Sequence, residues 1–200
     1  MKDTILIDFD GVLRHWSGAE VKDAETMLGL DSGTLFAWTF SPQLLTPAIT
    51  GIISHEEWRE RVHSKLAHLY DDNIASQLVV AWDEASWEID THFLRGLQQL
   101  APTCKLVLVT NATSRLDSDL RKAGLTSAFD WVVNSSQIKV AKPESRFFGK
   151  ALSIAGSKVS NAIFIDDSLD NVNAARSIGI ASIHHKNAIE TLKFIQRQCA

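Results

Sequence analysis

The chain of 200 residues is long enough for one domain, or for one core with a sizeable insertion. Hydrophobic residues make up 45% and charged residues 22%, which suits a soluble globular protein and excludes collagen-like, disordered and coiled-coil chains. The formal net charge of -4, without a run rich in Lys or Arg, argues against nucleic acid as a partner.

The cysteine content and the N-terminal sequence favour the cytoplasm. Cys104 and Cys199 are the only cysteines, and their spacing fits neither a metal site nor a disulfide framework, so we expect a reducing compartment. No basic leader precedes the first apolar residues, and no apolar run reaches the roughly 20 residues of a membrane span. We therefore expect a cytoplasmic protein with no membrane partner.

The first predicted element is a buried strand over residues 4–9, TILIDF, and a long insertion follows it. Between this strand and Lys105 the sequence has no convincing strand pattern but several helical ones. One of them, over residues 54–70, begins with Ser54 and Glu57 in capping-box spacing and continues as an amphipathic helix.

The insertion is also rich in tryptophan, which would allow it a small core of its own. Five of the six tryptophans lie there: Trp16, Trp38, Trp58, Trp82 and Trp87. We therefore predict an α-helical cap over residues 15–90, inserted into a core made of residues 1–14 and 91–200.

Beyond the insertion, strand and helix patterns alternate. Apolar runs typical of buried strands cover residues 105–110, 130–134, 161–166 and 180–185. Helical patterns closed by glycine cover residues 114–124, 144–156 and 169–179. This β-α-β-α order predicts an α/β fold with a doubly wound, mostly parallel sheet.

Several predicted strands end in polar residues that suit chemistry. The residues are Asp8 and Asp10, then Thr110 and Asn111, and finally Asp166 and Asp167. In a doubly wound sheet, ligands bind beyond the carboxyl ends of the strands, so four carboxylates are expected to meet at one rim. Such a concentration of negative charge requires a cation, and Mg²⁺ prefers hard oxygen ligands of this kind. Any one of these residues alone is more often a helix cap or a turn residue, but the group is not explained in that way.

Four sequence motifs in order resemble those of the haloacid dehalogenase superfamily of phosphohydrolases. They are DFDGVL, LVLVTN, AKPESRFF with Lys142, and FIDDSLDN. The insertion directly after the first motif is where subclass I of this superfamily carries a helical cap. The resemblance covers most of the chain and implies a Rossmann-like core with that cap.

The resemblance implies roles for the carboxylates. Asp8 would be the nucleophile that forms an aspartyl phosphate, and Asp10 the general acid and then the general base. The implied metal site contains Asp8, the backbone carbonyl of Asp10, and Asp167, with Asp166 either a ligand or a partner that positions water.

The resemblance also implies a phosphate-binding group. Thr110 would contact phosphoryl oxygens through its hydroxyl, Asn111 through its backbone N–H, and Lys142 through its charge. Lys139 lies close by and competes with Lys142, but Lys142 fits better because a proline and a helix follow it.

Two positions depart from the pattern of the superfamily. Val12 stands where threonine is more frequent, and this is a tolerated variant. Asn171 stands where many members place another acid. Asn171 either weakens metal binding or marks a variant in which Asp166 and Asp167 share the task.

The function expected from these motifs is Mg²⁺-dependent hydrolysis of a small phosphomonoester, with a small phosphorylated metabolite as partner. A phosphomutase acting on a sugar phosphate would use the same residues and stays open. A 2-haloacid dehalogenase is less favoured because its chemistry does not need the acid at Asp10. A phospho-accepting module is disfavoured by the order of the motifs. A binding protein without catalysis is disfavoured by the intact set of Asp8, Asp10, Thr110, Lys142 and Asp167. The substrate, the contacts of Arg14, His15, Trp16 and Trp38, and the choice between monomer and homodimer are left open by the sequence.

Overall fold

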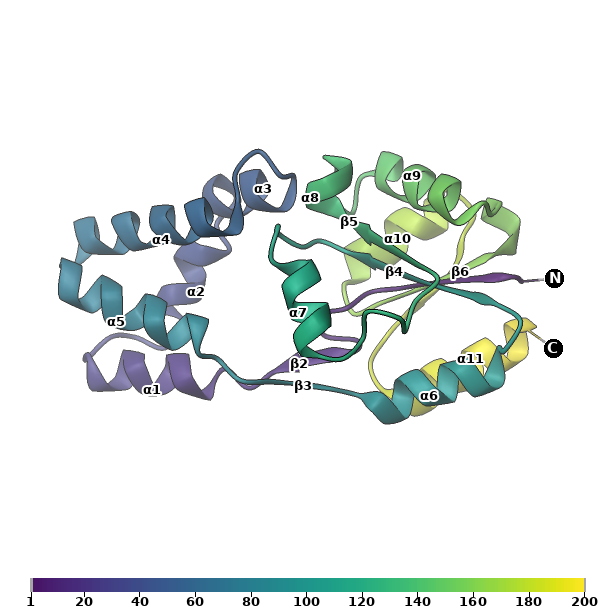
Figure 1. The fold of residues 1–200 in the computed structure, drawn as a ribbon, viewed down its shortest axis with the longest axis horizontal. Coiled ribbons are helices and arrows are strands. Elements are labelled where there is room, and N and C mark those ends of the chain that lie inside the picture. The colour runs from purple at the N-terminus through teal and green to yellow at the C-terminus, as the bar shows by residue number, and fades with distance from the viewer. Residues whose placement is uncertain (1, 200) are drawn as a thin grey trace.

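The centre of the fold is a five-stranded parallel sheet, seen in a computed structural model that describes residues 2–199 (Figure 1). Its strands are β1 (Thr4–Ile7), β4 (Lys105–Thr110), β5 (Trp131–Asn134), β6 (Ala162–Asp166) and β7 (Ala181–His184). Their order across the sheet is β5-β4-β1-β6-β7, and all the pairs are parallel. The predicted α/β fold with a doubly wound sheet is confirmed.

The strands have unbroken apolar runs because an apolar layer of helices packs on each face of the sheet. Ile5 and Ile7 of β1 pack with the helices α6 (Thr91–Leu100), α7 (Leu116–Lys122) and α11 (Ala188–Cys199). Leu6, between them, faces the helices α9 (Ser145–Ala155) and α10 (Leu169–Ser177) on the other side. Because successive side chains of a strand point to opposite faces, a strand covered on both faces has to be apolar throughout.

The strand order reverses next to β1, and this position determines where a ligand can bind. From β1 the chain proceeds outward to β4 and β5 on one side, and then returns to β6 and β7 on the other. The loops that follow β1 and β6 therefore diverge and leave a crevice at their carboxyl ends. Asp8 and Asp167 directly follow these two strands.

The helices predicted from periodicity are present with slightly shorter bounds. Residues 114–124 contain α7, residues 144–156 contain α9, and residues 169–179 contain α10. Two short helices, α8 (Ser135–Ile138) and the 3₁₀ helix η1 (Val159–Asn161), complete this part of the chain. None of the helices between residues 2 and 199 is long and apolar enough to cross a membrane.

A helical unit is inserted between β1 and β4 and lies at one end of the molecule (Figure 1). It contains α1 (Ala19–Met27), α2 (Thr34–Thr39), α3 (Pro42–Ile49), α4 (His55–Leu69) and α5 (Asp72–Asp83). The expected capping box, Ser54 with Glu57, begins α4. These helices enclose an apolar cluster of their own, with Trp58 buried and with Trp38 and Trp82 at its edge. We call this unit the cap, although its role and the domain boundaries stay predictions.

Two short strands connect the cap to the core, and their presence corrects the expectation that the insertion holds no strand. β2 (Arg14–Trp16) and β3 (Trp87–Ile89) form an antiparallel ribbon, in which Trp16 lies opposite Trp87. Each strand has three residues, too few for an alternating pattern to be recognised. Their pairing joins segments about seventy residues apart in the sequence, so no local signal could reveal it.

Candidate active site

The side chain of Lys142 lies between two of the predicted carboxylates. Its Nζ is 2.8 Å from Asp8 Oδ1 and 2.7 Å from Asp166 Oδ2, and it donates a third hydrogen bond to the carbonyl of Val109 at 3.1 Å. Burial lowers the pKa of Lys142, but the charges of Asp8 and Asp166 outweigh this effect and raise the pKa above its ordinary value. Lys142 therefore stays charged at the end of β1.

Lys139, the competing lysine, lies elsewhere. Its Nζ donates to the carbonyl of Gly51 in the cap, so it has no contact with the carboxylates. Gly51 itself has a positive φ, and an added Cβ would lie 2.1 Å from the carbonyl oxygen of Ser136. The cap and α8 approach each other closely at this point.

Asp166 is fully buried, and hydrogen-bond donors occupy its carboxylate. Oδ1 accepts from the backbone N–H of Ser168 at 2.8 Å and Oδ2 accepts from Lys142, while the side-chain amide of Asn171 lies 3.1 Å from both oxygens. A carboxylate has about four acceptor sites, and four contacts reach this one. Asn171, which the sequence presented as a departure, therefore holds Asp166 in place.

Asp167 has more solvent around it and lies directly against the loop after β1. Gly11 has a φ of +79°, and a Cβ built on it would be 2.1 Å from Asp167 Oδ2. Only glycine permits both this backbone conformation and this close approach. The glycine of the first motif therefore has a geometric purpose, which is to bring the loops of β1 and β6 together.

Three carboxylates with one lysine leave an excess of negative charge. Asp8, Asp166 and Asp167 each offer an oxygen, and these oxygens all lie within 4.8 Å of one another. Burial raises the pKa of Asp8 to about 8, against the opposing charge of Lys142, and burial followed by the charge of Asp166 raises the pKa of Asp167. A set of oxygen donors with uncompensated charge fits a hard divalent cation such as Mg²⁺.

Asn111 contributes to the site in a manner that the sequence did not indicate. Its side-chain Nδ2 donates to the carbonyl of Lys142 at 2.9 Å, and its Oδ1 accepts from the backbone N–H of Lys142 at 2.8 Å. This reciprocal pair fixes the backbone that carries Lys142. Thr110, the last residue of β4, is buried at the same edge of the sheet and lies in register with Asn134 of β5.

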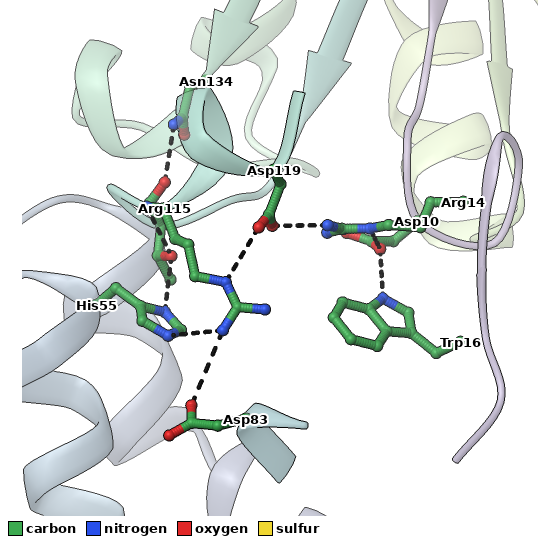
Figure 2. Close-up of polar contacts among 9 residues, drawn as sticks. Asp10, Arg14, Trp16, His55, Asp83, Arg115, Asp119 and Asn134 are labelled. Atoms are coloured by element: carbon green, nitrogen blue, oxygen red, sulfur yellow. Dashed lines mark hydrogen bonds and ion pairs between the residues drawn. The ribbon is translucent and has the colours of Figure 1, made fainter. Parts of the chain in front are cut away.

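Two residues of the ribbon, Arg14 and Trp16, bind the side chain of Asp10 (Figure 2). Arg14 Nε and Nη2 donate to its two oxygens at 2.7 and 2.9 Å, and Trp16 Nε1 donates to Oδ1 at 2.8 Å. Burial lowers the pKa of Arg14, but its bonds to Asp10 and Asp119 outweigh this and raise it. The sequence left the contacts of Arg14 and Trp16 open, and both contact Asp10.

From Arg14 a chain of polar contacts continues into the cap (Figure 2). Arg14 Nη1 donates to Asp119 Oδ2 at 2.7 Å, and Arg115 Nε reaches the other oxygen of Asp119 at 3.2 Å. Arg115 also contacts Asp83 of α5 at 3.9 Å and Nε2 of His55 in α4 at 3.3 Å. The cap is thereby connected to the core through paired charges.

His55 has a definite protonation state in this network. Arginine only donates hydrogen bonds, so Nε2 of His55 accepts from Arg115, and its Nδ1 donates to Thr113 Oγ1 at 3.0 Å. Burial, followed by the charge of Arg115, lowers the pKa of His55. Thr113 is itself fixed by Asn134, whose side-chain amide donates to the Thr113 carbonyl at 2.9 Å (Figure 2).

A cavity of about 530 Å³ lies between the cap and the core, next to Asp10. The polar or small residues that line it are Asp10, Arg14, Gly18, His55, Ala85, Asn111, Ala112, Thr113, Arg115 and Asp119. Its large apolar residues are Trp16, Phe36, Phe40, Leu45, Ile49, Trp58, Trp82 and Leu116. A ligand bound at Asp8 would extend into this cavity past Asp10.

Comparison with known proteins identifies the family. Residues 2–179 match the model of the haloacid dehalogenase-like hydrolases, so the chain belongs to this hydrolase family. A drimenol cyclase of Aspergillus calidoustus is 27% identical over 95% of this chain and 35% of that protein. A phosphoglycolate phosphatase of Caulobacter vibrioides is 31% identical over 44% of this chain and 40% of its own length. A sesquiterpene phosphatase of Aspergillus oryzae is 24% identical over 80% of this chain and 88% of its own length. The chain therefore spans well under half of the first two of these proteins.

Solved structures show the same fold at low sequence identity. A HAD family enzyme of Bacteroides thetaiotaomicron, crystallised with magnesium and inorganic phosphate, has a TM-score of 0.74 at 22% identity, over 93% of this chain and 95% of that one. An L-2-haloacid dehalogenase of Xanthobacter autotrophicus has a TM-score of 0.63 at 19% identity, over 91% and 76% of the two chains. Both structures share the fold of this chain, so the fold alone does not decide the reaction, and the choice depends on the residues of the site.

Proposed function

We propose that this chain is a Mg²⁺-dependent phosphatase that hydrolyses a phosphomonoester through an aspartyl phosphate on Asp8. The observation that carries the proposal is the group formed by Asp8, Asp166, Asp167 and Lys142, with its three carboxylates and one cation. The two relatives named as phosphatases support the same reaction class.

In the first step Asp8 attacks phosphorus. Its Oδ1 accepts from Lys142 and, at 2.8 Å, from the backbone N–H of Phe9, whereas no residue between 2 and 199 donates to Oδ2. Oδ2 is thus the oxygen with an available lone pair. As the bond from Oδ2 to phosphorus forms, the bond from phosphorus to the alcohol oxygen breaks, and Asp10 supplies the proton that this oxygen takes.

In the second step water hydrolyses the aspartyl phosphate. Asp10, now ionised, accepts a proton from the water that attacks phosphorus, and Asp8 leaves as a carboxylate. The two hydrogen bonds that Asp10 accepts from Arg14 suit the ionised form of Asp10. Thr110 and Lys142 contact the phosphoryl oxygens and hold them in place during both steps.

Asp8 and Asp167 are the side chains that would hold the metal. Asp166 has donors at its acceptor sites and would have to lose one of them, so we assign it to the positioning of Lys142. A bound Mg²⁺ would offset the charge shared by the carboxylates and the phosphoryl group.

Asp10 favours phosphate esters over the alternative substrates. Its carboxylate faces the cavity where an alcohol would leave, and a halide ion, in contrast, needs no proton. A phosphomutase uses the same groups, and only the product separates it from a phosphatase.

The test is release of phosphate from p-nitrophenyl phosphate with and without Mg²⁺. We expect release to need the metal, to stop in Asp8→Asn, and to fall by about a hundredfold or more in Asp10→Asn, which loses the general acid and base. Acid quenching followed by mass spectrometry should find the phosphoryl group on the peptide that contains Asp8.

The matched control is Asp170→Asn, an exposed acid in the first turn of α10 that is outside the group of carboxylates able to hold a metal among residues 2–199. It should retain the parent rate. Full activity of Asp8→Asn, or turnover that survives excess chelator, would refute the mechanism. Isomerisation of a sugar phosphate without phosphate release would favour the phosphomutase.

A further inference from the structure

The polar side chains in the cavity are already paired with one another. Arg14 binds Asp10 and Asp119, and Arg115 binds Asp119, Asp83 and the Nε2 of His55. These pairs already use most of the donors and acceptors of these side chains, so the hydroxyl groups of a sugar or another polyol would find few partners there. Losing buried hydrogen bonds without equivalent replacements weakens binding.

The rest of the cavity wall is aromatic and aliphatic, and most of it comes from the cap, with Trp16 of the ribbon and Leu116 of α7 beside it. Phe36 of α2 and Phe40, which directly follows α2, stack with ring centroids 5.4 Å apart. Trp58 of α4 and Trp82 of α5 meet edge to face with centroids 4.8 Å apart. Leu45 and Ile49 of α3 complete the wall. Phe40 remains 54% exposed, so this part of the wall is accessible from solvent.

The apolar wall is continuous with the proposed reaction site. Asp10 and Asn111 belong to the lining, whereas Asp8, Asp166 and Asp167 do not. A phosphoryl group at Asp8 therefore places the oxygen of its alcohol near Asp10, and the remainder of the alcohol in the cavity.

From this arrangement we infer that the substrate is the phosphate monoester of an apolar alcohol, with an alkyl, prenyl or aryl group that fills the space between Phe36, Phe40, Trp58 and Trp82. The inference rests on the proposed phosphatase function and specifies its substrate class. The volume of about 530 Å³ is within the range of pockets that enclose a whole organic ligand. Sugar phosphates and small hydroxy-acid phosphates are then poor substrates.

The experiment compares ethyl, butyl, hexyl and octyl phosphate, below their micelle concentrations, with glucose 6-phosphate and phosphoglycolate. We expect kcat/KM to rise by about fourfold for each added methylene until the cavity is filled. The two polar esters should react no faster than ethyl phosphate. Binding of ethyl- and octylphosphonate, which cannot be hydrolysed, is measured in parallel by calorimetry with Mg²⁺ present.

Phe40→Ser tests the wall itself, because its exposed position makes the variant compatible with folding. The ratio of kcat/KM for octyl over ethyl phosphate should fall by about tenfold, the effect of losing much of one buried aromatic contact. Tyr70→Ser is the matched control, since Tyr70 is an aromatic residue of the cap that is 42% exposed and outside the cavity. It should retain the parent ratio, and circular dichroism verifies that both variants fold.

The outcomes separate the two proposals. Phosphate release without any preference for longer chains, or with preference for a polar ester, overturns the apolar substrate and leaves the phosphatase intact. No release from any ester, together with octylphosphonate binding more tightly than ethylphosphonate, overturns the phosphatase and supports the apolar subsite. An unchanged octyl-to-ethyl ratio in Phe40→Ser also overturns the assignment of the wall.

Discussion

Replacement of Arg14 by methionine tests whether the ribbon controls Asp10. The side chain of Arg14 is 6% exposed and donates two bonds to Asp10 and one to Asp119. Methionine has a similar length and fills the space, but it removes the charge and every donor. Arg14→Met therefore separates the loss of the ion pairs from the loss of packing.

The size of the effect follows from the surroundings of the two carboxylates. Removing one partner of a fully buried pair costs about 3–5 kcal/mol. Here the side chain of Asp10 is 40% exposed and can be hydrated again, and Asp119 keeps its bond to Arg115. We expect the free energy of unfolding to fall by about 3 kcal/mol, which corresponds to a Tm lower by about 6–12 °C.

The catalytic effect should be smaller than that of losing Asp10. General acid–base catalysis contributes about a hundredfold to ten-thousandfold, and Asp10→Asn loses all of it. Arg14→Met retains the carboxyl group but not its position, so we expect kcat to fall by about tenfold to a hundredfold. A positioning role should lower kcat more than it changes KM for the same aryl phosphate.

The assays are urea and thermal unfolding followed by circular dichroism, together with kcat and KM at saturating Mg²⁺. Arg14→Lys is the informative companion, since lysine restores the charge but cannot bind a carboxylate with two parallel bonds. It should recover part of the stability and little of kcat. If Arg14→Met unfolds at the parent urea concentration and keeps the parent kcat, the assigned role of Arg14 is wrong.

Two further predictions concern the glycine of the first motif and the histidine of the cap. Gly11→Ala should lower activity by about tenfold or more, because the added Cβ displaces Asp167, whereas Gly124→Ala, with a similar positive φ and open space around it, should lose only stability. Equal activity of the two variants would contradict the close approach. The second prediction uses the lowered pKa of His55. As the pH falls below the ordinary histidine pKa of about 6.5, the unfolded state binds more protons than the folded state, so the free energy of unfolding decreases as the pH decreases. The parent should therefore lose more unfolding free energy than His55→Gln between about pH 7.5 and about pH 5, and parallel pH profiles would contradict the assignment.

Local sequence patterns were sufficient to predict the strands and helices of the core and their order along the chain. A strand buried on both faces has to be apolar throughout, and a helix has to close its last turn, so β1, β6, α7, α9 and α10 are apparent from periodicity and glycines. The carboxyl ends of parallel strands share one edge of the sheet, which is why Asp8 and Asp167 could be expected near each other. The sequence favoured Lys142 over Lys139 because a proline and a helix follow it, and in the structure Lys142 contacts Asp8, whereas Lys139 contacts Gly51.

Only the tertiary structure decided how these residues are held and what surrounds them. Asn171 appeared to be a missing acid, but it binds Asp166, and the sequence left the contacts of Arg14 open, whereas in the structure it binds Asp10. The ribbon and the cavity likewise depend on segments far apart in the chain. A hydrogen bond or an ion pair depends on the distance between two atoms, and for residues distant in sequence that distance exists only after folding. Periodicity records which side of an element is buried, and it contains no information about the partner that the element meets there.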